Sequence, residues 1–304
     1  MAGKGASGKT GAKQQSMIKL LALDLDGTTL NSNGEIPYAN RAAIRAAEER
    51  GVLVTIATGR RFRDARPIAL DLALNAPLIC HNGALIKYAD SQETVACDLL
   101  STETSYEIVR VGKQFGGDAL VSTDPHQNGT LLYDRISDDN IPLKKYLRWS
   151  ETLHGGEAGR EGVMHVPSLE DILHKQEIVH ISFSGNCAPM IELEETLREE
   201  LGDNVTLLAT IYPTLDFTLL DILPPEASKG HGVAKLAELH GLTHESVMTM
   251  GDNFNDLEML EYAGTAVVMG NADAKLLDRE DFYSTLSNNE NGVAAAIERF
   301  ILNV

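Results

Sequence analysis

The chain has 304 residues, 43% hydrophobic and 23% charged, which is typical of a globular protein with one large or two modest domains. Its 26 Lys and Arg are outnumbered by 44 Asp and Glu, and the formal net charge of -18 argues against a nucleic-acid or anionic-membrane surface. No apolar run reaches membrane-spanning length. Cys80, Cys97 and Cys187 lack metal-ligand spacing, so we expect reduced thiols in a cytoplasmic protein.

The first sixteen residues are rich in Gly, Ala, Lys and Gln, and we expect a disordered tail over residues 1–16. Residues 3–10 match the pattern G-x-x-x-x-G-K-[ST] of a phosphate-binding loop. Such a loop works only between a strand and a helix, and here only two residues precede Gly3. We therefore discount the match. Nucleotide binding through it is an alternative that deletion of residues 1–16 would test.

Strands and helices alternate at both ends of the remaining chain. The apolar runs that predict buried strands are 18–23, 52–57, 76–80, 247–250 and 266–269. The segments that predict helices are 38–50, 61–74, 231–240, 257–263 and 292–301. This alternation predicts an α/β fold with a Rossmann-like parallel sheet and helices on both faces, formed by residues 17–85 and 224–304.

Between these two parts, residues 86–223 show strands in pairs with short turns, which predicts an inserted α+β cap domain. Its expected strands are 119–123, 130–134, 177–184, 205–209 and 216–223. Its expected helices are one that starts with a capping box at Thr104 and ends at Gly116, and further ones at 142–149, 168–174 and 189–201. We expect the Gly- and Glu-rich segment 154–162 to be a mobile loop.

Three of the predicted core strands end in polar sequences. Ligand sites of open α/β sheets lie beyond the carboxyl ends of the strands, so we expect these side chains in one crevice. They are four carboxylates, a hydroxyl and an ammonium, supplied by Asp24, Asp26, Asp252, Asp256, Thr58 and Lys229. Oxygen ligands without a His or Cys pattern favour a hard cation, above all Mg²⁺. Because Mg²⁺ shares its ligands with substrate phosphates, the cluster predicts phosphoryl chemistry.

The demands of phosphoryl transfer suggest a role for each residue. Asp24, fixed at a strand end, suits a nucleophile that forms an aspartyl-phosphate, and Asp26 could protonate the leaving oxygen and later activate water. The Thr58 hydroxyl and the Gly59 amide would contact phosphate oxygens, while Lys229 would offset negative charge. Of the remaining two carboxylates, Asp252 would ligate Mg²⁺ and Asp256 would orient the metal site from behind the direct ligands.

Four blocks of the sequence resemble, in order and spacing, the motifs of haloacid dehalogenase-like (HAD) hydrolases, and more narrowly the Cof-type phosphatases with a type IIB cap. The blocks are Asp24-Leu25-Asp26-Gly27-Thr28, Thr58-Gly59-Arg60, Ser228-Lys229-Gly230 and Gly251-Asp252-Asn253-Phe254-Asn255-Asp256. The resemblance covers residues 17–304. It implies Asp24 as nucleophile and Asp26 as acid and base, with metal contacts from both and the backbone carbonyl as the contact from Asp26. It also implies that Asn255 contacts the substrate phosphate.

We therefore expect a Mg²⁺-dependent phosphatase that acts on a small phosphorylated metabolite, with sugar phosphates as the first class to test. No nucleic-acid, membrane or protein partner is inferred. A phosphomutase of the same superfamily, of the phosphomannomutase type, is an alternative that product analysis would distinguish. A protein that only binds phosphorylated ligands is a further alternative, and the presence of both Asp24 and Asp26 argues against it.

Overall fold

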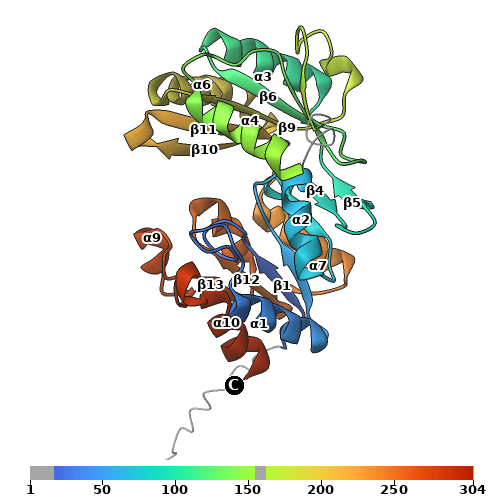
Figure 1. The fold of residues 1–304 in the computed structure, drawn as a ribbon, viewed down its shortest axis with the longest axis vertical. Helices are drawn as coiled ribbons and strands as arrows, with labels where there is room; N and C mark the ends of the chain where they lie inside the picture. Colours follow the sequence, from blue (N-terminus) through green and yellow to red (C-terminus); the bar gives the residue numbers. More distant parts are fainter. Residues whose placement is uncertain (1–16, 155–161, 304) are drawn as a thin grey trace, which may run out of the picture.

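In the computed structural model, which describes residues 17–154 and 162–303, five strands form a sheet in the lower half of Figure 1. In spatial order they are β14 (Tyr283–Ser284), β13 (Thr265–Val268), β12 (Val247–Gly251), β1 (Leu20–Leu23) and β2 (Leu53–Ile56). All neighbouring pairs are parallel. The predicted fold class is confirmed, although the short strand β14 was not predicted.

Helices cover both faces of this sheet, because successive residues of a buried strand point to opposite sides. The helices are α1 (Tyr38–Glu49), α2 (Phe62–Leu72), α7 (Lys229–Leu239), α8 (Leu257–Tyr262), α9 (Ala274–Leu277) and α10 (Gly292–Ile297). Leu21 and Leu23 of β1 pack in one apolar core with residues of α1, α2 and α10. Leu20 and Ala22 pack in another with residues of α7 and α8. The carboxyl end of β1 is therefore held rigidly.

A three-stranded antiparallel sheet adjoins the parallel sheet of the core. It consists of β3 (Leu78–Cys80), β4 (Leu85–Lys87) and β5 (Thr94–Cys97). Its first strand was predicted as part of the parallel sheet, and the other two strands were not predicted. One isolated parallel bridge joins β3 to the residue that follows β2. The boundary proposed at residue 86 falls within β4.

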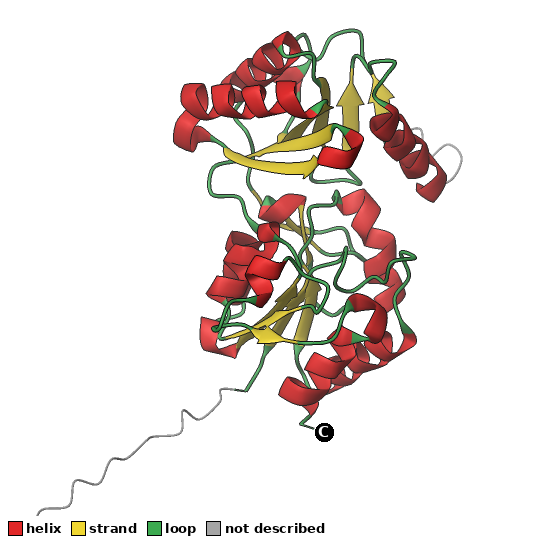
Figure 2. Cartoon of the chain, turned by 90° about the vertical axis from the view of Figure 1, so that its left-hand side faces the viewer, coloured by secondary structure: helices red, strands yellow, loops and turns green. Residues whose placement is uncertain are grey.

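The upper half of Figure 1 is a six-stranded sheet with helices on both sides. In spatial order its strands are β10 (Thr206–Tyr212), β11 (Phe217–Leu223), β9 (Ile178–Gly185), β6 (Asp118–Thr123), β7 (Thr130–Tyr133) and β8 (Val163–His165). Two helices, α3 (Thr102–Gln114) and α6 (Cys187–Leu201), cover the face turned away from the core (Figure 2). A smaller apolar cluster beneath helix α4 (Ile141–His154) lies on the opposite face of the six-stranded sheet. We call this upper half the cap.

A buried lysine of the core holds one turn of the cap. The Lys87 ammonium donates to the backbone carbonyls of Pro125 and Gln127, both at 2.6 Å, and lies 5.0 Å from the centre of the Phe62 ring. Its side chain is completely buried, and this burial lowers the pKa of Lys87. The β6–β7 turn of the cap is thus fixed to β4 of the core.

The cap helix α4 is held to the core by a second buried cation. The Arg61 guanidinium, directly before α2, donates to both carboxylate oxygens of Asp64 at 2.9 and 3.1 Å. It also donates to the hydroxyl of Ser150 in α4 at 2.7 Å. The hydroxyl of Tyr146, another residue of α4, donates to Asp64 at 3.1 Å. A buried ion pair with its hydrogen bonds satisfied in this way fixes geometry more than it adds stability.

Two local predictions in the cap are wrong. The cap residue of α3 is Ser101, whose hydroxyl accepts from the Thr104 amide at 3.0 Å, so the helix begins at Thr102. Residues 168–172 form turns in place of a helix, followed by a single 3₁₀ turn, Leu173–Lys175. The amide of Leu169 donates to the Asp134 carboxylate at 3.0 Å, which fixes the start of this segment against the β7 end.

The expected tail 1–16, the phosphate-binding pattern within it and residues 155–161 of the expected mobile loop lie outside the described residues. Within the described part of the chain, no helix combines the length and the apolar character needed to cross a membrane.

Candidate active site

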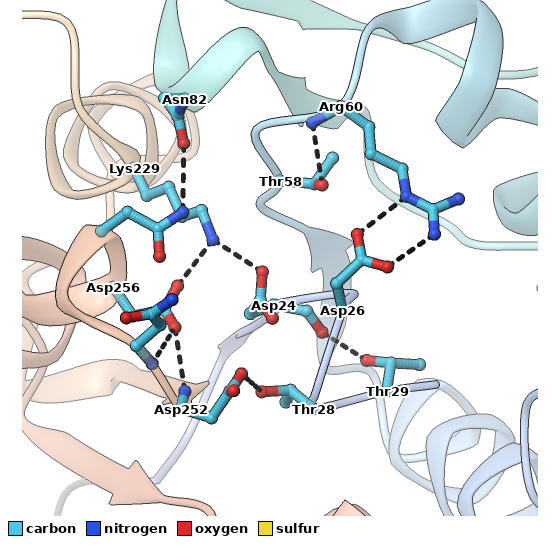
Figure 3. A network of polar contacts seen from close by, with 12 residues as sticks. Asp24, Asp26, Thr28, Thr29, Thr58, Arg60, Asn82, Lys229, Asp252 and Asp256 are labelled. Atoms are coloured by element: carbon cyan, nitrogen blue, oxygen red, sulfur yellow. Dashed lines mark hydrogen bonds and ion pairs between the residues drawn. The ribbon is translucent and has the colours of Figure 1, made fainter. Parts of the chain in front are cut away.

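The carboxyl ends of three adjacent strands bring the predicted site residues together (Figure 3). Asp24 directly follows β1, Thr58 lies two residues beyond β2, and Asp252 directly follows β12. Lys229 is the first residue of α7, whose preceding residue Ser228 caps the helix by accepting from the His231 amide at 3.0 Å.

Lys229 lies between two of the carboxylates. Its ammonium is 2.6 Å from Oδ1 of Asp24 and 2.7 Å from Oδ1 of Asp256, and all three side chains are buried. Burial alone would lower the pKa of Lys229, but the charges of Asp24 and Asp256 raise it above its ordinary value. Burial, together with the charges of Asp256 and Asp252, raises the pKa of Asp24 in spite of Lys229.

Asp252 completes a cluster of three carboxylates. One oxygen each of Asp24, Asp252 and Asp256 lies within 4.8 Å of the others. Burial first, and then the charge of Asp256, raises the pKa of Asp252 to about 6. Among the described residues Lys229 is the one ammonium bound to the cluster, so the three carboxylates, when ionised, exceed it by two negative charges. The donor set and this charge fit a divalent cation that prefers oxygen ligands.

The turn after β1 packs closely against the Asp252 carboxylate of this cluster. Thr28 donates its hydroxyl to Oδ1 of Asp252 at 2.9 Å. Gly27 has a φ of +84°, and a Cβ there would lie 2.3 Å from Oδ2 of Asp252, so any other side chain would displace that carboxylate. Gly27 is therefore required both by the turn and by the close approach.

Asp256 already uses both of its oxygens. Oδ2 accepts the amides of Asp252 at 2.9 Å and Asn253 at 3.0 Å, while Oδ1 accepts from Lys229. Its position thus fixes the backbone of the loop that carries Asp252, which agrees with an orienting role.

Thr58, Gly59 and Asn255 meet around Asn82, a residue that follows strand β3 and was not predicted as a site residue. The Thr58 hydroxyl accepts from the amide of Arg60 at 3.1 Å. A Cβ on Gly59 would lie 3.1 Å from the Asn82 amide group, and the Asn255 amide donates to Asn82 at 3.4 Å. Asn82 itself has a φ of +48°, within the left-handed region that Asn tolerates better than most residues.

Asp26 lies apart from the three-carboxylate cluster. Because β1 ends at Leu23, the strand alternation that would align the side chains of Asp24 and Asp26 does not extend to Asp26. The Asp26 carboxylate is 58% exposed and accepts two hydrogen bonds from Arg60, at 2.8 and 2.6 Å. Arg60, the last residue of the second sequence block, thus forms a salt bridge with Asp26.

A cleft of about 530 Å³ lies between these residues and the cap. Its floor includes Asp24, Thr58 and Lys229, and its upper wall comes from β6, β9, β10, β11 and α4 of the cap. Two cap residues of this wall, His180 and Asp221, were not predicted as site residues. No motif surrounds them in the sequence, and only the pairing of β9 with β11 brings them together.

Comparison with known proteins identifies the family. The sequence model of the haloacid dehalogenase-like hydrolases matches residues 21–297. The chain belongs to the haloacid dehalogenase-like hydrolases. The family predicted from the four sequence blocks is confirmed.

Relatives cover nearly the whole chain of this HAD member. It is 31% identical to the stress response protein YhaX of Bacillus subtilis, over 93% of each chain. It is 30% identical to the 5-amino-6-(5-phospho-D-ribitylamino)uracil phosphatase YwtE of the same organism, over 93% of this chain and 98% of that one. A haloacid dehalogenase-like hydrolase structure from Bacteroides thetaiotaomicron superposes with a TM-score of 0.76 at 25% identity, covering 93% of this chain and 99% of that one. The family and these relatives assign this HAD protein to the phosphoric monoester hydrolases.

Proposed function

We propose that this HAD protein is a Mg²⁺-dependent phosphatase that hydrolyses small organophosphates through an aspartyl-phosphate on Asp24. The observation that carries the proposal is the cluster of Asp24, Asp252 and Asp256 around Lys229 at the strand ends. Its excess negative charge suits a divalent cation, and its position at the base of a cleft suits a phosphate that such a cation would bind.

The metal would be held by three groups of this chain: the carboxylates of Asp24 and Asp252 and the backbone carbonyl of Asp26. Asp256 would keep Asp252 in place through the amide bonds described above. When bound, Mg²⁺ supplies positive charge next to the phosphoryl oxygens and next to the attacking carboxylate.

Asp24 and Asp26 divide the chemical work. The Asp24 carboxylate forms a bond to phosphorus as the bond from phosphorus to the ester oxygen breaks. Asp26, protonated and released from its ion pair with Arg60, gives that oxygen a proton. Asp26 then takes a proton from water, whose oxygen bonds to phosphorus as the bond to Asp24 breaks. Inorganic phosphate leaves, and both carboxyl groups return to their starting states.

The phosphate would be oriented by groups around the cluster. Thr58 contributes its hydroxyl, Gly59 its backbone amide and Asn255 its side-chain amide, while Lys229 contributes positive charge. All four line the cleft. Preorganised donors of this kind stabilise charge that develops on phosphoryl oxygens in the transition state.

The substrate class rests on the size of the cleft and on the relatives. YwtE is named for a pyrimidine that carries a phosphorylated sugar alcohol. A cleft of about 530 Å³ accommodates a metabolite of that size. We propose small phosphorylated metabolites as substrates and sugar phosphates as the first class to test. We also propose a cytoplasmic location, in keeping with three cysteines that form no disulfide.

The test is release of inorganic phosphate from a panel of phosphate esters with Mg²⁺ and with a chelator. We expect turnover only with the metal, and Asp24→Asn should lose about a thousandfold or more in kcat. Asp138→Asn is a matched control, because this fully exposed cap carboxylate binds Lys144 alone among the described residues, at 3.2 Å. Equal turnover by Asp24→Asn and Asp138→Asn would refute the nucleophile. Transfer of phosphate to a second hydroxyl of the same sugar would indicate a mutase.

A further inference from the structure

The cap wall of the cleft contains a pair of ionisable residues, one buried and one partly buried, that the reaction described above does not use. His180 of β9 and Asp221 of β11 lie 2.9 Å apart, from Nε2 to Oδ1, and both line the cleft. Neighbouring cleft-lining positions on the same strands are Ser182 and Leu219, two residues along in each case. The pair therefore lies on the sheet face that is turned toward the catalytic cluster.

A third side chain, His81 of the core, fixes the orientation of His180. Nδ1 of His81 is 3.4 Å from Nδ1 of His180. The bond to Asp221 assigns a proton to Nε2 of His180, and Nδ1 of His180 faces Nδ1 of His81, so side chains engage both ring nitrogens of His180. Burial, with His180 and Arg61 close by, lowers the pKa of His81 well below its ordinary value, so His81 is neutral. Neither ring nitrogen of His180 is therefore free to bind an anion in the cleft.

Asp221 also retains hydrogen-bonding capacity. His180 binds Oδ1, and among the described residues Oδ2 has no hydrogen bond or ion pair. The Asp221 side chain is 14% exposed, at the wall of the cleft. A carboxylate oxygen in this position can accept a hydrogen bond from a bound molecule but repels a second anion.

The lysine and arginine side chains that line the cleft in the described structure belong to the core, and each is paired with a carboxylate. Arg60 binds Asp26, Arg61 binds Asp64, and Lys229 binds the catalytic cluster. Within the described part of the cap, no lysine or arginine lines the cleft. The wall that would face the leaving group therefore has a carboxylate oxygen able to accept a hydrogen bond. Its described part has no lysine or arginine to bind a second phosphate or a carboxylate.

We propose that Asp221 is a specificity-determining residue that accepts a hydrogen bond from a hydroxyl or amino group of the leaving group. The preferred substrates are then phosphate monoesters whose far end is neutral or cationic and hydrogen-bonding, and bisphosphates and phosphorylated acids are rejected. His180 and His81 are positioning residues for Asp221. This inference rests on the proposed phosphatase function and specifies its substrate class.

Three substrates separate the contributions: a hexose monophosphate, the corresponding hexose bisphosphate and p-nitrophenyl phosphate, whose leaving group bears no hydroxyl or amino group. For the wild-type protein with Mg²⁺, we expect kcat/KM for the monophosphate to exceed that for the bisphosphate about a hundredfold, which is 2.7 kcal/mol at 1.36 kcal/mol per tenfold. Asp221→Ala should lower kcat/KM for the monophosphate about tenfold or more and change p-nitrophenyl phosphate turnover less than about threefold.

Two further variants separate charge from hydrogen bonding and from positioning. Asp221→Asn keeps an acceptor but removes the charge, so the preference for monophosphate over bisphosphate should shrink about tenfold. His180→Gln keeps a donor toward Asp221 and should preserve selectivity, whereas His180→Leu should lose it. Asp138→Asn serves again as the matched cap variant and should behave as the wild type.

The possible failures have different signatures. Equal losses on all three substrates in the Asp221 variants would mean a structural role, and a wild type that does not discriminate against the bisphosphate would also overturn the inference. The inference would also be overturned if the wild type hydrolysed p-nitrophenyl phosphate but neither hexose phosphate. If the wild type with Mg²⁺ hydrolyses none of the three, the proposed function itself fails, and this inference with it.

Discussion

The guanidinium of Arg60 donates to both carboxylate oxygens of Asp26, at 2.8 and 2.6 Å (Figure 3). It also lies 5.6 Å from the centre of the Trp149 ring. Asp26 belongs to the core and Trp149 to helix α4 of the cap. Arg60 therefore contacts both the residue we propose as acid and base and the domain that covers the cleft. The position of the Asp26 carboxylate depends on a side chain that the cap also contacts.

Arg60→Ala should lower kcat about tenfold, because Asp26 loses the two hydrogen bonds that orient its carboxylate. Arg60→Lys should recover part of the loss, since an ammonium supplies charge without the two-pronged geometry. Steady-state kinetics would measure kcat of both variants, and thermal melting would check that they fold. Arg45→Ala removes an exposed arginine paired with Glu49 at 3.4 Å and should change neither kcat nor the melting temperature. Unchanged kcat in Arg60→Ala would refute an orienting role.

Asp252→Asn should make the metal-free protein more stable at pH 7 while abolishing phosphatase activity. Burial and the Asp256 charge raise the pKa of Asp252 from 3.8 to about 6, so its ionised form destabilises the folded state. With 1.36 kcal/mol per pKa unit and partial solvent screening, we expect a gain of about 1–2 kcal/mol.

The pH dependence of that gain identifies its cause. A carboxyl group whose pKa is raised on folding destabilises the protein above the folded pKa, and the effect disappears below the unfolded pKa. The stabilisation in Asp252→Asn should thus be full at pH 7 and absent by about pH 4. Urea unfolding with a chelator present would measure it. A gain that is the same at both pH values would point to packing instead of charge.

The three cysteines should react with iodoacetamide at very different rates at pH 8. Burial raises the pKa of Cys80, and burial followed by the charge of Asp98 raises the pKa of Cys97 to about 12. The thiolate is the reactive form, so both should remain unmodified in the folded protein. Cys187, half-buried in the first turn of α6, should be alkylated first, as peptide mass spectrometry would detect. Early modification of Cys97 would contradict the expectation.

Lys87→Met should destabilise the protein by about 1–3 kcal/mol, since the carbonyls of Pro125 and Gln127 lose the ammonium donor, although the Pro125 carbonyl keeps the Thr94 hydroxyl at 3.0 Å. Met fills similar volume against Phe62, so the loss reports on the hydrogen bonds and the charge. Urea unfolding would measure it. Lys144→Met, at a lysine whose partner Asp138 is fully exposed, should cost much less. Equal effects of the two substitutions would mean that the buried contacts contribute little.

The convergence of Asp24, Thr58 and Asp252 could be anticipated because each follows a strand, and parallel strands present their carboxyl ends at one edge. The orientation of Asp26 could not. It depends on the residue at which β1 ends and on Arg60, which follows a different strand.

The pair of His180 and Asp221 lay beyond sequence reasoning for another reason. The two residues are separated by α6, β10 and two turns, and their contact follows from the antiparallel register that places Asp221 opposite Ser182. A shift of that register by one residue would turn Asp221 to the other face of the sheet. His81 adds a contact between two domains, which no local pattern of either domain contains.

Lys87 recognises the β6–β7 turn only through main-chain oxygens, which every amino acid possesses. The turn can therefore exchange its side chains without loosening the attachment, provided that its backbone keeps its course. The lysine has no such freedom, because its ammonium is the donor. Substitutions in the β6–β7 turn can therefore change the side chains of the cap without breaking its attachment to Lys87, whereas a substitution of Lys87 itself removes that attachment.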